Sequence, residues 1–227
     1  MYIKSKIILI RGISVQNSIL KEQMEHREVY EFLKRFVDIV CSLIGLMVLM
    51  PILVIVAILI RIESKGSMIF SQDRVGKDGI VFKMYKFRSM VVNAEDLKEK
   101  LANENERTGP MFKIKDDPRI TKVGKFIRKT SIDELPQLVN ILKGEMSIVG
   151  PRPSLPKEVQ CFDEWMMKRL EVKPGLTCYW QVSGRNEIEF NEWMKLDVKY
   201  VNERNILIDI TLILKTFFVL FGDSHAS

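Results

Sequence analysis

With 227 residues, of which 47% are hydrophobic, the chain is long enough for one domain with a sizeable core, or for one domain plus a membrane element. A formal net charge of +6 favours anionic partners, but composition does not choose among nucleic acid, acidic lipid and nucleotide diphosphates. The three cysteines form no C-x-x-C motif and there are only two histidines, which excludes a plausible zinc site. We therefore interpret Cys41, Cys161 and Cys178 as reduced packing residues of a cytosol-facing protein.

Residues 1–29 carry little functional signal. The apolar run 7–10 is too short for the core of a signal peptide, and Arg11 and Gly12 end it. The pattern from residue 14 to about 35 predicts a polar helix. We interpret residues 1–29 as an N-terminal surface arm and assign no chemistry to it.

The most hydrophobic segment, residues 39–60, contains no charged residue and is long enough to cross a bilayer as one helix. Pro51 lies in its middle, where it bends or breaks a helix. Basic residues flank both ends, and the positive-inside rule places such flanks in the cytoplasm. A proline-kinked spanning helix and a re-entrant hairpin both fit these observations. We expect Asp38 at the interface, because a deeply inserted carboxylate costs about 2.5–3.5 kcal/mol.

A β-hairpin is predicted next. Lys77-Asp78-Gly79 separates the apolar runs 68–70 and 80–82, and Asp-Gly accepts the positive φ that such turns require. The basic residues of this segment are also explained by an ordinary solvated strand face: Arg74, Lys83, Lys86 and Arg88.

Two further helical stretches follow the hairpin. A charged helix is predicted over 95–106, and the Gly-Pro pair at 109–110 ends it. The motif D-D-P-R at 116–119 opens another short helix that reaches Arg128 and Lys129. An arginine at position 128 carries no functional signal on its own.

Two adjacent carboxylates, Asp133 and Glu134, fall on the opening turn of a predicted short helix. Apolar residues recur there at three- and four-residue spacing, and Gly144 follows the last of them. Pro136 is tolerated only near the helix start, where its missing N–H would have had no partner. A purely structural explanation exists, because Ser131-x-x-Glu134 is also a capping box and acidic residues favour helix N-termini.

Arg152 follows this helix between two prolines. Pro151 and Pro153 restrict the backbone and so could preorganise the guanidinium, although an isolated P-R-P is equally explained as a rigid turn with an exposed arginine. Together with Arg128 it gives a cationic pair that could flank one phosphoryl group.

The last third of the chain predicts three helices. An amphipathic helix covers 157–171, a second runs from residue 190 to about 202, and an apolar tail covers 206–221. The tail is interrupted by Asp209 and Lys215, which fits either an interfacial amphipathic helix or a core helix.

Several separate motifs resemble, in the expected order, those of the bacterial sugar transferases. These are monotopic phosphoglycosyl transferases that load a sugar phosphate onto a polyprenyl phosphate. The resemblance extends from about Tyr30 to about Gly222. It is carried by K-F-R-S-M at 86–90, D-E-L-P-Q at 133–137, G-E-M-S-I-V-G-P-R-P at 144–153 and the glycine-arginine-asparagine segment ending at residue 186. The chain departs from many relatives at Cys178-Tyr179, so this loop predicts nothing about the sugar.

The resemblance implies a two-step reaction. Asp133 is expected to attack the sugar-bearing β-phosphate of a UDP-sugar, release UMP and hold the phosphosugar as an acyl phosphate, which undecaprenyl phosphate then attacks. A carboxylate can attack phosphorus where cations neutralise the phosphate charge. Glu134 is expected to bind Mg²⁺, and Asp197 matches a family aspartate for which we expect a structural role. The implied substrate and phosphate contacts are Lys86, Arg88, Arg128, Arg152, Gln181 and Arg185.

We predict a mainly helical α+β fold: a membrane-associated catalytic domain with a β-hairpin and an N-terminal re-entrant, helix-break-helix membrane hairpin whose bend contains Pro51. The expected organisation is a 1–29 arm, a 30–62 re-entrant membrane helix, a 63–222 cytoplasmic phosphoglycosyl transferase domain with a C-terminal interfacial helix, and a 223–227 tail. We expect no additional multi-span N-terminal region.

The resemblance also implies a location and a pathway. The enzyme is expected to be monotopic, on the cytoplasmic face of the bacterial inner membrane among membrane lipids, and to initiate capsule, exopolysaccharide or O-antigen synthesis. Glucose, galactose and N-acetylated sugars all remain open as the donor sugar, and so does the oligomeric state.

Two other functions remain open. A membrane-tethered basic binding protein explains the net charge and the apolar run but not the carboxylate pair or the ordered basic motifs, and the chain lacks a nucleic-acid motif, so no nucleic-acid partner is expected. A metal-dependent glycosyl transferase that keeps the diphosphate on its nucleotide would release UDP.

Overall fold

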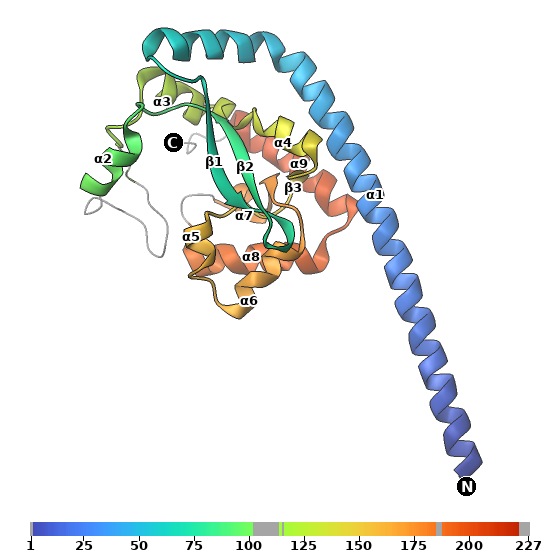
Figure 1. Cartoon of the computed structure of the whole chain (residues 1–227). Coiled ribbons are helices and arrows are strands. Elements are labelled where there is room, and N and C mark those ends of the chain that lie inside the picture. The colour runs from blue at the N-terminus through green and yellow to red at the C-terminus, as the bar shows by residue number, and fades with distance from the viewer. Residues whose placement is uncertain (1, 102–113, 115, 185–187, 223–227) are drawn as a thin grey trace. The chain divides into compact units, whose positions relative to one another are not determined.

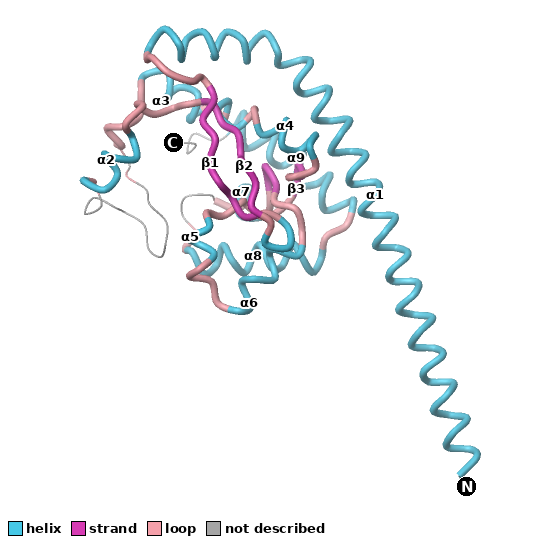
Figure 2. The backbone as a smooth tube through the Cα atoms, in the orientation of Figure 1, coloured by secondary structure: helices cyan, strands magenta, loops and turns pink. Residues whose placement is uncertain are grey.

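The computed structural model describes residues 2–101, 114, 116–184 and 188–222, and within these it is mainly helical with two small sheets (Figures 1 and 2). Its α-helices are α1 (Tyr2–Glu63), α2 (Ala94–Lys100), α3 (Lys122–Lys129), α4 (Gln137–Lys143), α5 (Pro156–Val159), α6 (Glu164–Met167), α7 (Tyr179–Val182), α8 (Phe190–Glu203) and α9 (Ile206–Gly222). The 3₁₀ helices are η1 (Lys77–Gly79), η3 (Ile132–Glu134) and η4 (Lys168–Glu171), and the strands are β1 (Ile69–Val75), β2 (Val81–Phe87), β3 (Ser147–Val149) and β4 (Gly175–Thr177). The mainly helical α+β prediction is confirmed.

The chain divides into two compact units, Met1–Val37 and Asp38–Ser227. Helix α1 belongs to both units, and it continues through Pro51 with a bend in its C-terminal half instead of a break (Figure 1). A proline inside a helix removes one backbone hydrogen bond and bends the axis. Among the described residues, His26–Glu63 is the one segment long and apolar enough to cross a membrane. The re-entrant path of this segment stays a prediction.

One face of α1 after residue 38 packs into the second unit. Val56 and Ile60 are buried against Phe87 of β2 and Ile127 of α3. Asp38 is only 4% exposed and accepts hydrogen bonds from the Ser147 hydroxyl at 3.0 Å and the Ile148 N–H at 2.9 Å. These donors satisfy the Asp38 carboxylate inside the protein, and the position of Asp38 at a membrane interface stays a prediction.

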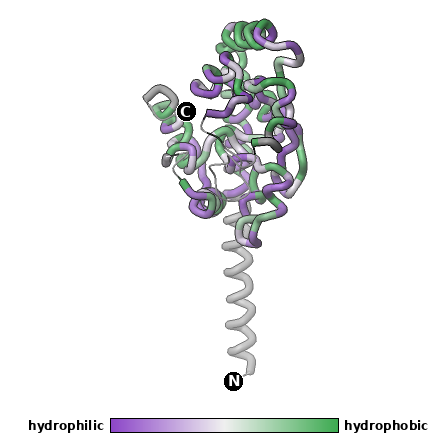
Figure 3. Tube along the Cα trace, turned by 90° about the vertical axis from the view of Figure 1, so that its left-hand side faces the viewer, coloured by the Kyte–Doolittle hydropathy of each residue, from purple (hydrophilic) through white to green (hydrophobic). Residues whose placement is uncertain are grey.

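The opposite face of the same part of α1 is apolar and exposed. Met47 and Ile62 are each 77% exposed, and Figure 3 shows hydrophobic residues along this stretch of the helix. Soluble domains rarely expose so long a contiguous apolar surface, so this face is available to a lipid or protein partner.

Strands β1 and β2 form the predicted antiparallel hairpin around Lys77–Gly79. Asp78 has φ of 56° and Gly79 has φ of 78°, which are the left-handed values that favour Asp and Gly in such a turn. The register pairs Arg74 with Phe82, and side chains of paired residues point to the same face of a hairpin. Residues 72, 74, 82, 84 and 86 therefore share one face.

Strands β3 and β4 form a parallel pair at the centre of the second unit. The backbones approach so closely after β3 that a Cβ on Gly175 would lie 2.1 Å from the Gly150 nitrogen. This contact requires glycine, and it fixes the chain where it leaves β3. Val149 packs with Tyr200 of α8 and Leu212 of α9 in one buried cluster.

Helix α9 combines both alternatives left open by the sequence. Its inner face contains buried Leu212 and Asp209, and the Asp209 carboxylate accepts a 2.8 Å hydrogen bond from the Tyr200 hydroxyl. Its outer face exposes Phe217 and Phe218, at 62% and 73%. One side of α9 packs in the core, and the other side exposes an apolar surface.

Two predicted helices and the interpretation of the cysteines differ from the structure or extend beyond the described residues. The predicted helix over 157–171 is divided into α5, α6 and η4, because Asp163 is extended and begins a new helix. Helix α2 replaces the first part of the predicted 95–106 helix, and residues 102–113 lie outside the described residues. Cys178 is buried as expected for a packing residue, whereas Cys41 and Cys161 are exposed.

Candidate active site

The carboxylate pair begins in a strained turn and not in a capping box. Ser131 adopts a left-handed conformation with φ of 56°, and its side chain makes no capping hydrogen bond. Asp133 and Glu134 lie in the 3₁₀ helix η3, and α4 starts after Pro136. A non-glycine residue held at positive φ is a local strain that often accompanies functional sites. The capping-box explanation therefore does not account for Glu134.

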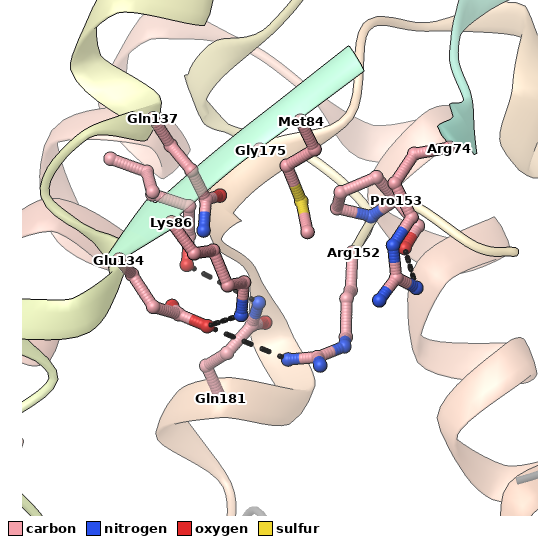
Figure 4. A pocket seen from close by; sticks show the side chains of 10 residues that line it. Arg74, Met84, Lys86, Glu134, Gln137, Arg152, Pro153, Gly175 and Gln181 are labelled. Carbon is pink, nitrogen blue, oxygen red and sulfur yellow. Dashed lines mark hydrogen bonds and ion pairs between the residues drawn. The ribbon is translucent and has the colours of Figure 1, made fainter. Parts of the chain in front are cut away.

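The Glu134 carboxylate instead faces cations from two distant segments (Figure 4). Its Oε1 lies 2.6 Å from Nζ of Lys86 on β2 and 3.9 Å from Nη1 of Arg152. Arg152 also lies over the Trp180 ring, with its guanidinium carbon 5.9 Å from the ring centroid. The hairpin, the η3 turn and the P-R-P segment thus converge on one carboxylate.

Donors from several elements form hydrogen bonds with the backbone carbonyls of the P-R-P segment and of Ser154. The carbonyls of residues 151–154 accept, in order, from Gly175 N, Arg169 Nη2, Arg74 Nη1 and Val75 N at 2.9, 2.6, 3.1 and 2.9 Å. Arg169 also donates to the Ser154 hydroxyl and forms a fully buried pair with Asp197 at 2.7 Å. The backbone of Arg152 is therefore fixed on both sides, as the two prolines predict. This contact also gives Asp197 the structural role that we expected.

A small polar pocket lies where these elements meet. It is lined by Arg74, Met84, Lys86, Glu134, Gln137, Arg152, Pro153, Gly175, Leu176 and Gln181. Figure 4 shows Glu134, Lys86, Arg152 and Gln181 pointing toward one another. Among these lining residues, three are cationic and one is anionic, so the pocket favours a phosphate or another anion.

Asp133 is buried next to this pocket and is 9% exposed, but it is not one of the lining residues. Burial raises the pKa of its carboxyl to about 6; the positive charge of Lys86 opposes this rise and the neighbouring Glu134 adds to it. Arg128 and Arg152 also act to lower this pKa. A carboxyl with a raised pKa among several cations is typical of a functional group and unusual for a helix-capping residue.

Comparison with known proteins agrees with this geometry. The model of the family described as bacterial sugar transferase matches residues 29–223. The chain belongs to the bacterial sugar transferase family. All of the pocket-lining residues lie inside the matched region.

Three relatives of this sugar transferase differ in how much of their own length it covers. It is 52% identical over 188 residues to "Galactosyl transferase CpsE" of Streptococcus agalactiae, covering 82% of this chain and 42% of the relative. It is 42% identical over 215 residues to "Undecaprenyl-phosphate galactose phosphotransferase" of Salmonella typhimurium, covering 93% and 43%. It is 38% identical to "Exopolysaccharide production protein ExoY" of Sinorhizobium fredii, covering 81% and 83%. The chain thus spans less than half the length of the first two relatives.

The remaining predicted site residues of the sugar transferase fall into different positions. Gln181 lines the pocket, and its side-chain amide donates to the Leu176 carbonyl at 3.4 Å. Arg128 is exposed in the last turn of α3 and is not a lining residue, although its charge acts on Asp133. Arg185 lies outside the described residues.

Arg88 does not line the pocket either. Its guanidinium donates to the Ser64 carbonyl and hydroxyl, each at 2.8 Å, and to the Lys65 carbonyl at 3.1 Å. These groups directly follow α1, whose last carbonyls have no partner within the helix and favour a nearby cation. In this structure Arg88 therefore anchors the end of α1, and the phosphate contact that the resemblance implies stays a prediction.

Two pocket residues with polar side chains were absent from the predicted site. Gln137 completes D-E-L-P-Q and begins α4, and Arg74 lies on β1. The signal for Arg74 was present in the hairpin pattern: counting outward from the turn pairs it with Phe82, on the face shared by Met84 and Lys86. An apolar neighbourhood on that face indicates burial, which the solvated-strand interpretation overlooked for Arg74.

Proposed function

We propose that this chain transfers a sugar 1-phosphate from a UDP-sugar to undecaprenyl phosphate and releases UMP. The observation that carries the proposal is the buried Asp133 carboxyl with a pKa of about 6, next to a small cationic pocket, in a chain of the bacterial sugar transferase family. The names of two relatives specify galactose, so UDP-galactose is the first donor to test. The reaction would begin the synthesis of a capsule, an exopolysaccharide or an O-antigen.

In the first step, a carboxylate oxygen of Asp133 attacks the β-phosphorus of the donor. The bond from this phosphorus to the bridging oxygen breaks, and UMP leaves with the electron pair. In the second step, a phosphate oxygen of the lipid attacks the same phosphorus and the aspartyl oxygen leaves, which regenerates the carboxylate and forms the lipid diphosphosugar. Lys86 and Arg152 would offset the negative charge on the phosphoryl oxygens.

We also propose Mg²⁺ as the cofactor. Glu134 offers a hard oxygen ligand at the pocket, and its side chain remains 30% exposed. Among the described residues, no group of three or more His, Cys, Asp or Glu is arranged to hold a metal. This donor set fits Mg²⁺, which binds through one or two carboxylates together with substrate phosphates and water. When bound, the ion would neutralise diphosphate charge.

For the location, we propose a monotopic enzyme on the cytoplasmic face of the inner membrane. The exposed apolar faces of α1 after residue 38 and of α9 support contact with lipid. The re-entrant path of α1 is a further part of the proposal, supported by the bend in the helix that contains Pro51 and by basic residues on both sides of the apolar run. A water-soluble nucleotide sugar and a lipid phosphate could then meet at the headgroup plane.

The test measures nucleotide release from a panel of UDP-sugars by the full chain in detergent, with undecaprenyl phosphate and Mg²⁺. The expected result is UMP from one donor, loss of this release in Asp133→Asn, and loss on chelation of the metal that added Mg²⁺ reverses. Without acceptor, the wild-type protein should gain the mass of one phosphosugar.

Two controls identify the nucleophile and the reaction type. Glu134→Gln should still form the covalent adduct slowly, whereas Asp133→Asn should not form it. Adduct formation by Asp133→Asn and not by Glu134→Gln would exchange the two roles. Release of UDP in place of UMP would overturn the phosphosugar mechanism in favour of simple glycosyl transfer, and no release from any donor would favour the binding-protein alternative.

A further inference from the structure

Two buried arginines hold the P-R-P segment, and their electrostatic surroundings differ. Arg169 is paired with the carboxylate of Asp197 at 2.7 Å. Arg74 is 8% exposed, and the partners of its hydrogen bonds are the neutral Pro153 carbonyl at 3.1 Å and the Gln72 amide oxygen at 2.9 Å. Within the described part of the chain, no carboxylate forms an ion pair with Arg74 and its Nε has no hydrogen-bond partner. Its positive charge is thus buried without direct compensation.

The neighbourhood of Arg74 makes this charge more unfavourable. Burial and, to a smaller extent, the nearby positive charge of Arg152 lower the pKa of its guanidinium to about 10, against weaker opposing effects of Glu158 and Glu134. A buried charge normally requires a paired charge of opposite sign. The two hydrogen bonds also engage only two of the five N–H groups of the guanidinium. An anion in the pocket would satisfy both needs.

The fold directs Arg74 into the same pocket as the carboxylate pair. Arg74 and Lys86 share one face of the hairpin, and both line the pocket. Figure 4 shows the Arg152 guanidinium between the Lys86–Glu134 pair and Arg74. The pocket therefore presents cationic groups both beside Glu134 and away from it, which is the arrangement that a diphosphate needs.

We propose that Arg74 binds a phosphate group in this pocket, the one farther from the Asp133–Glu134 pair. This inference rests on the proposed function and extends it. The phosphate attacked by Asp133 would lie near Lys86 and Arg152, so the group at Arg74 is the phosphate that leaves with the nucleotide. The planar fork of arginine suits two oxygens of one phosphate, which a lysine ammonium does not reproduce.

The test compares the binding of UMP and uridine to the full chain in detergent by calorimetry. Arg74→Gln should weaken UMP binding by about tenfold or more, because a charge-assisted hydrogen bond is lost, and leave uridine binding unchanged. Arg74→Lys, which keeps the charge, should give a smaller loss and serves as the second variant if Arg74→Gln does not fold. Lys83→Gln is the matched control, because Lys83 is exposed on the opposite face and pairs with Asp73. It should bind UMP like the wild type.

Several results would overturn the proposal. Equal UMP affinity in the wild type and in Arg74→Gln would overturn it. Equal losses of uridine and UMP affinity in Arg74→Gln would also overturn it, because they indicate a disturbed fold. If Arg74→Gln causes no further loss of UMP affinity in a protein that already carries Arg152→Gln, Arg74 acts only by positioning the Arg152 side chain.

Farnesyl phosphate distinguishes the source of the phosphate. A loss confined to this probe would overturn the assignment of Arg74 to the nucleotide phosphate and place Arg74 at the phosphate of the lipid instead. A wild-type protein that binds neither UMP nor farnesyl phosphate would overturn the proposed function together with this inference, whereas normal UMP binding by Arg74→Gln overturns the inference alone.

Discussion

The carboxyl group of Asp133 is subject to two opposing influences. Burial disfavours its ionised form, while Lys86, Arg128 and Arg152 favour it, and the outcome is a pKa of about 6. Without these cations the carboxyl would stay protonated to higher pH and could not attack phosphorus near neutrality. In the proposed mechanism the cations would therefore serve the nucleophile as well as the substrate phosphates.

The ionisation of Asp133 predicts a pH dependence. Because only the carboxylate is nucleophilic, kcat/KM for UMP release should rise about tenfold per pH unit below pH 6 and level off above it. The measurement is a profile from pH 5 to 8.5 with saturating lipid acceptor. A profile that stays flat between pH 5 and 7 would contradict a nucleophile with this pKa.

Lys86→Met provides the control for this profile. Lys86 is the largest influence that lowers the pKa of Asp133, so its removal should move the inflection to higher pH in addition to reducing the plateau. Lys83→Gln, on the exposed face of the same strand, should leave the inflection in place. A reduced plateau with an unchanged inflection would limit Lys86 to substrate binding.

Individual site residues could be predicted to different degrees. Lys86, Glu134, Arg152 and Gln181 were predicted and line the pocket, because each belongs to a local motif. Arg88 belongs to the same motif as Lys86 but contacts the end of α1, since a motif does not determine where a long side chain points. Gln137 and Arg74 were not predicted as site residues, although the D-E-L-P-Q motif and the hairpin pattern contained a signal for each.

Among the elements, the P-R-P segment depends most on distant parts of the chain. Its three carbonyls and that of Ser154 accept hydrogen bonds from β1, β4 and the 3₁₀ helix η4. Arg169 of η4 donates the hydrogen bond to the Arg152 carbonyl. Its positive charge can be buried there only because Asp197 of α8 neutralises it.

Arg169→Met should lower the free energy of unfolding by about 3–5 kcal/mol, because it leaves Asp197 buried without its partner. The double change Arg169→Met with Asp197→Leu should recover much of this stability but not the rate of UMP release, since the carbonyl of Arg152 still lacks its donor. Denaturant unfolding and the release assay measure the two effects. Recovery of both by the double change would exclude a positioning role for Arg169.

Elements whose conformation is set by neighbouring residues were easier to predict from the sequence than elements whose conformation depends on distant contacts. The hairpin was predicted because Asp78-Gly79 favours the turn by itself. The predicted 157–171 helix is divided into α5, α6 and η4, because its apolar spacing does not reveal that Asp163 is extended. The break in α1 was expected from Pro51, yet the helix tolerates this residue with a bend.

Within the second unit, α1 after residue 38 and α9 each have one face in the core and one apolar face exposed. We expect both exposed faces to enter the membrane interface, since aromatic and aliphatic residues gain about 1.5–3 kcal/mol each when removed from water. The sequence left the role of α9 open because its buried Asp209 resembles an interruption of the apolar pattern.

Replacement of Phe217 and Phe218 by serine should reduce binding to anionic vesicles by about tenfold or more without reducing UMP affinity. Co-sedimentation with vesicles measures the partitioning, and calorimetry measures the nucleotide. Ile80→Ser is the matched control, because Ile80 is exposed at the hairpin turn and lies on neither helix. An equal loss for this control would show that membrane binding does not depend on α9.

The hairpin register has a consequence for how insertions would act on the pocket. Gln72, Arg74, Met84 and Lys86 share a face only while the pairing across Lys77–Gly79 is kept. A one-residue shift of β1 would turn Arg74 outward and present Asp73 and Val75 in its place, because side chains alternate along a strand. Insertion of a single residue near the turn would thus replace a guanidinium by a carboxylate on this face of the hairpin, without any amino-acid substitution. The turn length therefore sets the sign of the charge on this side of the pocket.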